Sequence, residues 1–183
     1  MTFLAPDIFD AYFAALIEMG PSCWRDYLQD HTWTPRATLA LVQAGLKAFP
    51  DGLKVARGHR DSYGRSEYLT LDVAITDSTW GPPLFIAEHE NAPYPEKIKY
   101  DAWKLLVTEA KRRVLVGYYG PRTKVRTFEE LRAAVEEVCR DNPGKDILLI
   151  GGEWAAVPTS AEELRKAHHT AVVGVHAVPV GTT

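Results

Sequence analysis

The sequence predicts an α/β domain in which a mixed β-sheet is flanked by helices. Three observations predict this fold class. Segments with apolar residues at helical spacing alternate along the chain with short segments of strand character. Three strand-like segments in the middle of the chain follow one another with no helix between them, which is typical of an antiparallel meander. Each later strand-like segment follows a predicted helix, which is typical of a crossover connection.

The first part of the chain is predicted to be helical. Apolar residues recur at helical spacing over residues 6–19, and an early proline suits the first turn. Residues 20–33 are rich in aromatic side chains and show no regular pattern. A second helix is expected over 35–48, with Thr34 as its N-cap and Pro35 in its first position.

The remaining elements follow from the same two periodicities. In chain order we expect strands near 53–58, 67–76 and 84–91, a helix over 95–112, a strand over 114–119, a helix over 127–140, a strand over 147–150, a helix over 160–168 and a strand over 171–178. Thr127 and Glu130 form a capping-box pattern. No internal repeat and no linker-like run interrupts this order, so residues 1–183 are expected to form a single domain.

Composition predicts an ordinary soluble protein of the cytoplasm. The formal net charge of −3 argues against a uniformly basic coat for nucleic acid, although a local basic patch over an acidic site would suffice to bind it. The only two cysteines, Cys23 and Cys139, do not suggest a disulfide scaffold or a zinc cage. The N-terminus does not read as a signal peptide, and no apolar run approaches the roughly 18 residues of a membrane span.

Residues 67–91 are predicted to form a β-hairpin that carries acidic side chains. In its first strand, alternation places Leu71, Val73 and Ile75 on one face. That apolar face must pack against a core, which leaves Asp72 on the other face. Aspartate is disfavoured within a strand, so its presence there indicates a functional role.

The second strand of the hairpin carries two more acids on a single face. Glu88 and Glu90 share that face, whereas His89 lies on the other and is expected to be a core histidine. If the turn is centred near Trp80, the residue numbers of cross-strand partners sum to 160, and Asp72 lies opposite Glu88. Side chains that face one another in this way are roughly 5 Å apart at Cβ, so three carboxylates would crowd one patch.

Crowded carboxylates repel one another, and they persist only if a proton, a basic side chain or a cation neutralises them. Oxygen ligands with no cysteine nearby favour Mg²⁺ or Mn²⁺ over zinc. A divalent cation held by Asp72, Glu88 and Glu90 could polarise a phosphate oxygen and activate water, which is the chemistry of phosphodiester hydrolysis. A register shifted by one residue would instead place the acids of the two strands on opposite faces, and only a generic α/β domain would remain.

The pattern resembles that of the PD-(D/E)XK, or restriction-endonuclease-like, nuclease superfamily. In that superfamily an acidic residue on one hairpin strand is followed by a Glu-x-Lys or Glu-x-Glu triplet on the next. The resemblance implies an αβββαβ core over residues 35–119, with residues 120–183 as a C-terminal αβαβ extension. It also implies that Asp72 and Glu88 are metal ligands and that Glu90 occupies the position usually held by the catalytic lysine.

Glu90 is a departure from the commonest form of the motif, because a carboxylate cannot act on the attacking water as a lysine does. Some superfamily members carry glutamate at this position, and others recruit a lysine from the following helix. That helix offers Lys97, Lys99 and Lys104 here, and Lys104 is the expected substitute. The expected catalytic set is therefore Asp72, Glu88, Glu90 and Lys104.

The loop after the first strand is a candidate for binding phosphates. It contributes Arg57, Arg60 and Arg65, although a plain solvated loop would have a similar composition. The expected function is a divalent-metal-dependent nuclease with DNA as its partner, and a homodimer would suit cleavage of both strands. The alternative is a catalytically inactive nuclease-like domain that binds nucleic acid or protein, which Glu90 and the acidic net charge favour.

Overall fold

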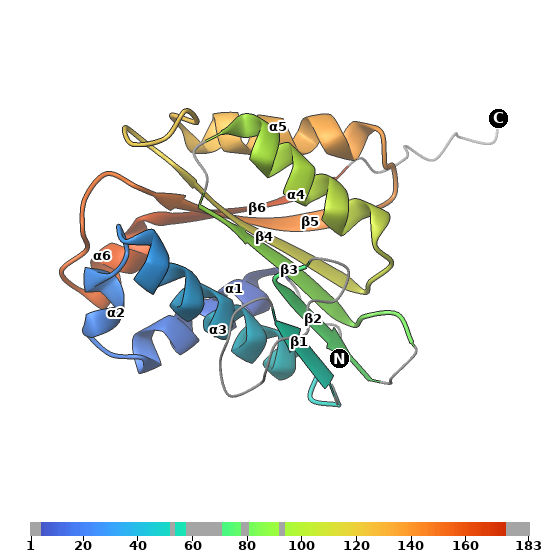
Figure 1. Ribbon diagram of the computed structural model, residues 1–183, viewed down its shortest axis with the longest axis horizontal. Coiled ribbons are helices and arrows are strands. Elements are labelled where there is room, and N and C mark those ends of the chain that lie inside the picture. Colours follow the sequence, from blue (N-terminus) through green and yellow to red (C-terminus); the bar gives the residue numbers. More distant parts are fainter. Residues whose placement is uncertain (1–4, 52–53, 58–70, 78–80, 92–93, 175–183) are drawn as a thin grey trace.

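Six strands form one mixed β-sheet in a computed structural model of the chain, which describes residues 5–51, 54–57, 71–77, 81–91 and 94–174 (Figure 1). The strands are β1 (Lys54–Arg57), β2 (Val73–Thr76), β3 (Phe85–Glu90), β4 (Arg112–Tyr119), β5 (Asp146–Glu153) and β6 (His168–Gly174). The helices are α1 (Ala5–Glu18), α2 (Ser22–Arg25), α3 (Asp30–Ala48), α4 (Pro95–Val107), α5 (Phe128–Arg140) and α6 (Ala161–Lys166). The predicted fold class, α/β with a mixed sheet flanked by helices, is confirmed.

The spatial order of the strands follows their order in the chain, β1 to β6. β1, β2 and β3 are an antiparallel meander, whereas β3, β4 and β5 run parallel and are connected through α4 and α5. β6 returns antiparallel to β5. The meander and the helical crossovers that the sequence predicts are therefore both present.

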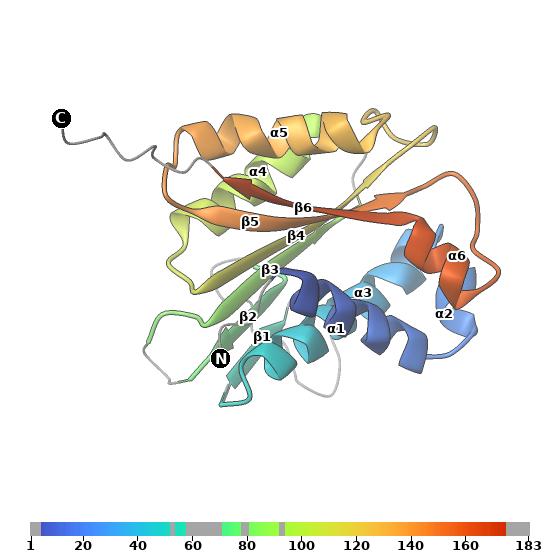
Figure 2. The same ribbon diagram turned by 180° about the vertical axis from the view of Figure 1, so that it is seen from behind.

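Helices cover both faces of the sheet and create two hydrophobic cores (Figures 1 and 2). α1 and α3 pack on one face, against side chains such as Val73, Phe85 and Val116. α4 and α5 pack on the other face, against side chains such as Ile86 and Leu115. Within the described ranges, no helix combines the length and apolar character that crossing a membrane requires.

Several element boundaries agree with the sequence prediction. α1, α5 and α6 lie within two residues of their expected limits. Thr127 is the N-cap of α5, and its side chain accepts a hydrogen bond of 3.1 Å from the amide of Glu130, as the capping box requires. α4 is shorter than expected because it ends at Val107 and Arg112 already belongs to β4.

The predicted start of the second helix is wrong, because α3 begins at Asp30. Thr34 is therefore not the N-cap, and Pro35 lies inside the helix. The extra turn contains Trp33, which is fully buried and packs edge-on against Tyr27 at 5.0 Å between ring centroids. Burial of this indole extends the helix beyond the Thr-Pro signal, so tertiary packing overrides the local capping preference here.

The predicted alternation of β2 fails at Asp72. Val73 and Ile75 enter the core beneath α1 and α3, but Leu71 packs in the opposite core, with Ile86 and α4. The ladder with β3 begins only at Val73. Asp72 thus lies at an irregular position that bends the strand, which suits a side chain that hydrogen-bonds to backbone. Positions 67–70 of the predicted strand lie outside the described residues.

His168 opens β6 and is buried between α1 and the sheet, where its ring packs edge-on against Phe13 at 6.0 Å. Its Nδ1 lies 2.7 Å from the carbonyl oxygen of Leu164, to which the neutral ring donates. Burial lowers the pKa of His168 from 6.5 to about 4. Folding therefore favours the neutral imidazole.

We expect the stability due to neutral His168 to be complete above about pH 6.5 and to be lost as pH falls towards 4, by up to about 3 kcal/mol. Urea unfolding of the wild type and of His168→Asn between pH 7 and pH 4 should show a flatter pH dependence in the variant. The matched control is His169→Asn, because His169 is the exposed neighbour. Equal pH dependence in the wild type and His168→Asn would contradict this origin.

Candidate functional site

The register of the β2–β3 hairpin brings its acidic residues together. The observed partners Val73 with Ala87 and Ala74 with Ile86 have residue numbers that sum to 160, as predicted. Beyond the last paired residue, an Asp72 carboxylate oxygen accepts a hydrogen bond of 2.9 Å from the amide of His89. The observed pairing excludes the alternative of a register shifted by one residue, and the Glu88 carboxyl group lies close enough to Asp72 to lower the pKa of Asp72 by hydrogen bonding.

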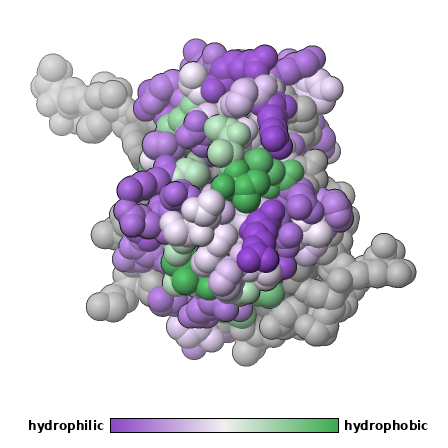
Figure 3. Space-filling view, turned by 90° about the vertical axis from the view of Figure 1, so that its left-hand side faces the viewer, coloured by the Kyte–Doolittle hydropathy of each residue, from purple (hydrophilic) through white to green (hydrophobic). Residues whose placement is uncertain are grey.

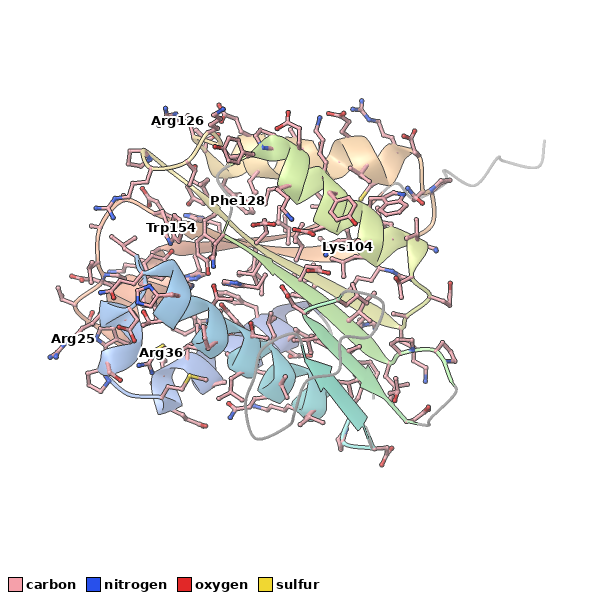
Figure 4. All side chains as sticks on the ribbon, in the orientation of Figure 1. Arg25, Arg36, Lys104, Arg126, Phe128 and Trp154 are labelled. Atoms are coloured by element: carbon pink, nitrogen blue, oxygen red, sulfur yellow. The ribbon has the colours of Figure 1, made fainter. Side chains whose placement is uncertain are left out.

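The crossover helix α4 places a lysine against this pair. Lys104 Nζ lies 2.7 Å from a carboxylate oxygen of Glu88 and 2.8 Å from one of Asp101. Figure 4 shows Lys104 in the space between α4 and the sheet. We call Asp72, Glu88, Asp101 and Lys104 the carboxylate–lysine cluster. Lys104 is the lysine that the sequence analysis expects as the substitute for the motif lysine, and it contacts one of the hairpin acids, while its catalytic role stays a prediction.

Asp101 is the member of the cluster that the sequence analysis missed. It is only 2% exposed and lies on the buried side of α4 with Ile98, Ala102 and Leu105. An acid at a core position of an amphipathic helix was the available signal, because a buried carboxylate needs a charged or hydrogen-bonding partner. Its partner, Lys104, is one helical turn further along the same helix.

The buried position of Glu88 disfavours the ionised form of its carboxyl group. It lies on a central strand, with β2 on one side and β4 on the other, and it is 3% exposed beneath α4. Burial raises the pKa of Glu88 from 4.5 to about 9, and the negative charge of Asp72 adds to the effect. With that pKa, the carboxyl group of Glu88 is protonated at neutral pH and donates to Asp72.

The other charges of the cluster respond to the same environment. Burial also raises the pKa of Asp72, although the amide of His89 and the ammonium of Lys104 oppose the shift. Burial alone would lower the pKa of Lys104, but hydrogen bonds to Asp101 and Glu88 outweigh it and hold the pKa above its usual value. Three carboxyl groups thus share one lysine, which leaves an excess of negative charge that a proton or a cation can neutralise.

Glu90 forms an ion pair with a different lysine of α4 from the one that contacts Glu88. Its carboxylate lies 3.4 Å from Lys97, the first lysine of α4. The acids that act on the pKa of Glu88 are Asp72 and Asp101. Across the parts of the chain that the structure describes, no group of three or more histidine, cysteine, aspartate or glutamate side chains is arranged to hold a metal ion.

A pair of carboxylates nevertheless fits the coordination that Mg²⁺ prefers in proteins. This ion keeps several of its waters and is commonly bound by one or two carboxylates together with substrate phosphates. Asp72 and Glu88 offer oxygens of this kind, and the raised pKa of both carboxyl groups marks a place where positive charge is needed. The residues present therefore fit a divalent cation that is completed by water and substrate.

The remaining sequence-predicted residues lie elsewhere. His89 is buried on the opposite face of β3, where its Nε2 lies 2.8 Å from the hydroxyl of Tyr118, as expected of a core histidine. Lys99 pairs with Glu137 of α5 at 2.6 Å and does not contact the cluster. Arg60, Arg65 and the side chain of Arg57 lie outside the described residues, so their predicted role with phosphates stays a prediction.

A concavity with a volume of about 380 Å³ lies beside α6, away from the cluster. The charged side chains that line it are those of Glu153, Glu163 and Lys166, all of them exposed. At the end of the molecule that carries α2 and α6, hydrophilic side chains surround a few hydrophobic ones (Figure 3). None of the charged side chains that line this concavity is buried or forced together as the cluster residues are, so the cluster is the better candidate site.

Comparisons of the chain with protein-family models, with curated proteins and with solved structures found no match. A functional assignment therefore depends on the chemistry of the site itself.

In protein stripped of metal by a chelator, we expect Glu88→Gln to be more stable than the wild type at high pH. Because the folded pKa of Glu88 is raised to about 9, its contribution to stability is present below about pH 4.5 and is lost as pH rises towards 9. The neutral amide avoids this loss. Urea unfolding at pH 5, 7 and 9 should therefore show the two proteins diverging as pH rises.

The matched control for this measurement is Glu129→Gln, because Glu129 is an exposed carboxylate on α5. Its replacement should leave the pH dependence of unfolding as in the wild type. A Glu88→Gln protein whose stability ran parallel to that of the wild type from pH 5 to 9 would show that Glu88 is ionised throughout.

Proposed function

We propose that this protein is a divalent-metal-dependent nuclease that hydrolyses phosphodiester bonds in DNA. The observation that carries the proposal is the contact between Lys104 of α4 and Glu88 of β3, at 2.7 Å. This contact places a lysine ammonium beside the acids of the hairpin. The strand itself provides no such group, because the usual lysine position of the motif is Glu90. A lysine next to a buried pair of carboxylates is a combination suited to binding a cation and an anionic phosphate together.

The order of the elements supports the proposal. α3, the meander β1–β2–β3, the crossover helix α4 and the parallel strand β4 have the αβββαβ order that the nuclease resemblance implies. The elements α5, β5, α6 and β6 then extend the sheet as an αβαβ unit. The hairpin and α4 are the two parts of this core that contribute to the carboxylate–lysine cluster.

Asp72 and Glu88 would hold Mg²⁺ or Mn²⁺ in the proposed enzyme. A bound divalent cation supplies Lewis-acid polarisation of a phosphate oxygen and lowers the pKa of water. The amide of His89 orients the Asp72 carboxylate by a hydrogen bond, so this ligand does not have to be ordered when the cation binds.

Lys104 has the role of a fixed positive charge beside the phosphate. Its ammonium keeps its proton, because Asp101 and Glu88 raise its pKa, and only 12% of its side chain is exposed. A charge held in a site that largely excludes water stabilises a phosphate anion more than one on a flexible surface chain would. Asp101 is a positioning residue, since it contacts Lys104 and lies on the buried side of α4.

A second candidate function is a nuclease-like domain that binds nucleic acid or protein without cutting. The observation that favours it is the ion pair between Glu90 and Lys97. The motif position that usually carries a lysine thus carries a carboxylate, and that carboxylate is paired with a lysine of α4. Cleavage assays separate the two functions. A homodimer and a location in the cytoplasm are further proposals that suit the nuclease reading.

We expect the wild type to cleave DNA in the presence of Mg²⁺ or Mn²⁺ and to stop when the metal is chelated. Asp72→Asn should abolish cleavage, and Lys104→Met should lower kcat by about 10²–10³-fold, since a fixed charge at the reacting group is lost. Lys99→Met is the matched control, because Lys99 belongs to the same helix but pairs with α5. Circular dichroism establishes that each variant is folded.

Two outcomes of that assay would contradict the nuclease proposal. Full activity in Lys104→Met would remove the lysine from the mechanism. Binding of DNA without cleavage under any divalent metal would instead favour the inactive binding domain.

Mn²⁺ binding should distinguish Asp72 and Glu88, the proposed metal ligands, from Glu90. In a calorimetric titration, we expect Asp72→Asn to lose Mn²⁺ binding, because half of the carboxylate pair is removed. Glu90→Gln should bind Mn²⁺ nearly as the wild type does, since Glu90 pairs with Lys97. If Glu90→Gln lost binding as completely as Asp72→Asn, Glu90 would be a ligand and the site would have to rearrange around the cation.

A further inference from the structure

α4 exposes two large aromatic side chains next to the carboxylate–lysine cluster. Tyr100 is 50% exposed and Trp103 is 47% exposed. Their rings are stacked, with 5.8 Å between centroids and an interplanar angle of 28°. Rings of this size contribute most when they are buried, so a stacked pair left in solvent on the helix that carries Lys104 indicates a surface with a binding role.

Lysines lie on the same side of α4 as this aromatic pair. Lys97 Nζ lies 5.7 Å from the ring centroid of Tyr100, and Lys104 Nζ lies 5.4 Å from it. Lys104 therefore contacts both the Tyr100 ring and the carboxylate of Glu88. Lys104 thus connects the aromatic pair to the cluster. A nucleobase stacked on the rings would therefore have its adjacent phosphates close to the cluster.

The same combination recurs at the N-terminal end of α4. Tyr94, the N-cap residue, is 45% exposed, and Lys124 Nζ lies 4.5 Å from its ring centroid. Tyr94, Lys97, Tyr100 and Lys104 are spaced by three or four residues and thus follow one side of the helix. Alternating aromatic rings and cations provide stacking surfaces for bases and charges for phosphates, which is the chemistry of single-stranded nucleic-acid binding.

We infer that Tyr100 and Trp103 form a stacking platform for an unpaired nucleobase, so that the substrate is single-stranded DNA or a single-stranded stretch within it. The inference rests on the nuclease proposed above and adds the form of its substrate. Bases inside an intact duplex are already stacked on both faces, so only an unpaired base offers a free face to the platform. The lysines beside the rings favour a nucleic acid over an apolar protein partner.

The test is binding of fluorescent oligonucleotides, measured by anisotropy in Ca²⁺ or chelator so that no cleavage occurs. The probes are a single strand, its duplex and a single strand with abasic positions. We expect the wild type to prefer the single strand, and the Tyr100→Ala/Trp103→Ala double variant to bind it about 10-fold or more weakly, with duplex binding unchanged. The wild type should bind the abasic strand about as weakly as the double variant binds the normal one.

Two controls separate stacking from other losses. Tyr100→Phe/Trp103→Phe keeps both ring faces and should retain the preference for the single strand. Val107→Ala changes an equally exposed aliphatic residue at the end of α4 and should bind as the wild type does. Mn²⁺ binding should be the same in all of these variants, which shows that the cluster is intact.

The possible failures are distinguishable. If the wild type cleaves DNA but the double variant binds and cleaves single strands equally well, the platform inference is wrong, the nuclease proposal stands, and the exposed rings are better explained as a protein-docking surface. Equal loss of single-strand and duplex binding would also overturn the inference. If the wild type binds no form of DNA, the proposed function and the platform both fail.

Discussion

The buried contact between Lys104 and Glu88 is the interaction on which the site depends. It connects the crossover helix α4 to the central strand β3 at 2.7 Å, in a region where water is largely excluded. Removing one partner of a buried ion pair, such as that between Lys104 and Asp101, typically costs about 3–5 kcal/mol, because the other charge is left buried and uncompensated. The presence of Asp101, which accepts a second hydrogen bond from Lys104, follows from this need. The acids are therefore arranged around the lysine as much as around any cation.

The two faces of β3 have different roles: one carries a member of the carboxylate–lysine cluster, and the other anchors the strand in the core. On one face Glu88 meets α4, and on the other His89 contacts the Tyr118 hydroxyl, which also accepts a hydrogen bond from the indole of Trp33. This buried chain joins β3 to β4 and to α3. A strand held on both faces and both edges keeps its side chains at fixed positions, which proton, cation and phosphate chemistry requires.

The parts of the fold that the sequence predicts well are those decided by local patterns. The hairpin register follows from a turn centred near Trp80, and the cap at Thr127 follows from a four-residue signal. The predictions that failed depend on distant contacts. The early start of α3 depends on burial of Trp33 against Tyr27, and the bend at Asp72 depends on the amide of His89. No pattern within either segment carries that information.

Lys104 illustrates how a helix can bring a positive charge to a carboxylate that lies on a neighbouring strand. Lys104 reaches the carboxyl group of Glu88 from α4 because this helix packs over the strand. A search that requires a fixed spacing between acid and lysine along one strand would overlook chains in which a helix supplies the lysine. Three-dimensional templates defined by the ammonium and carboxylate positions would recover them, whichever element delivers the lysine.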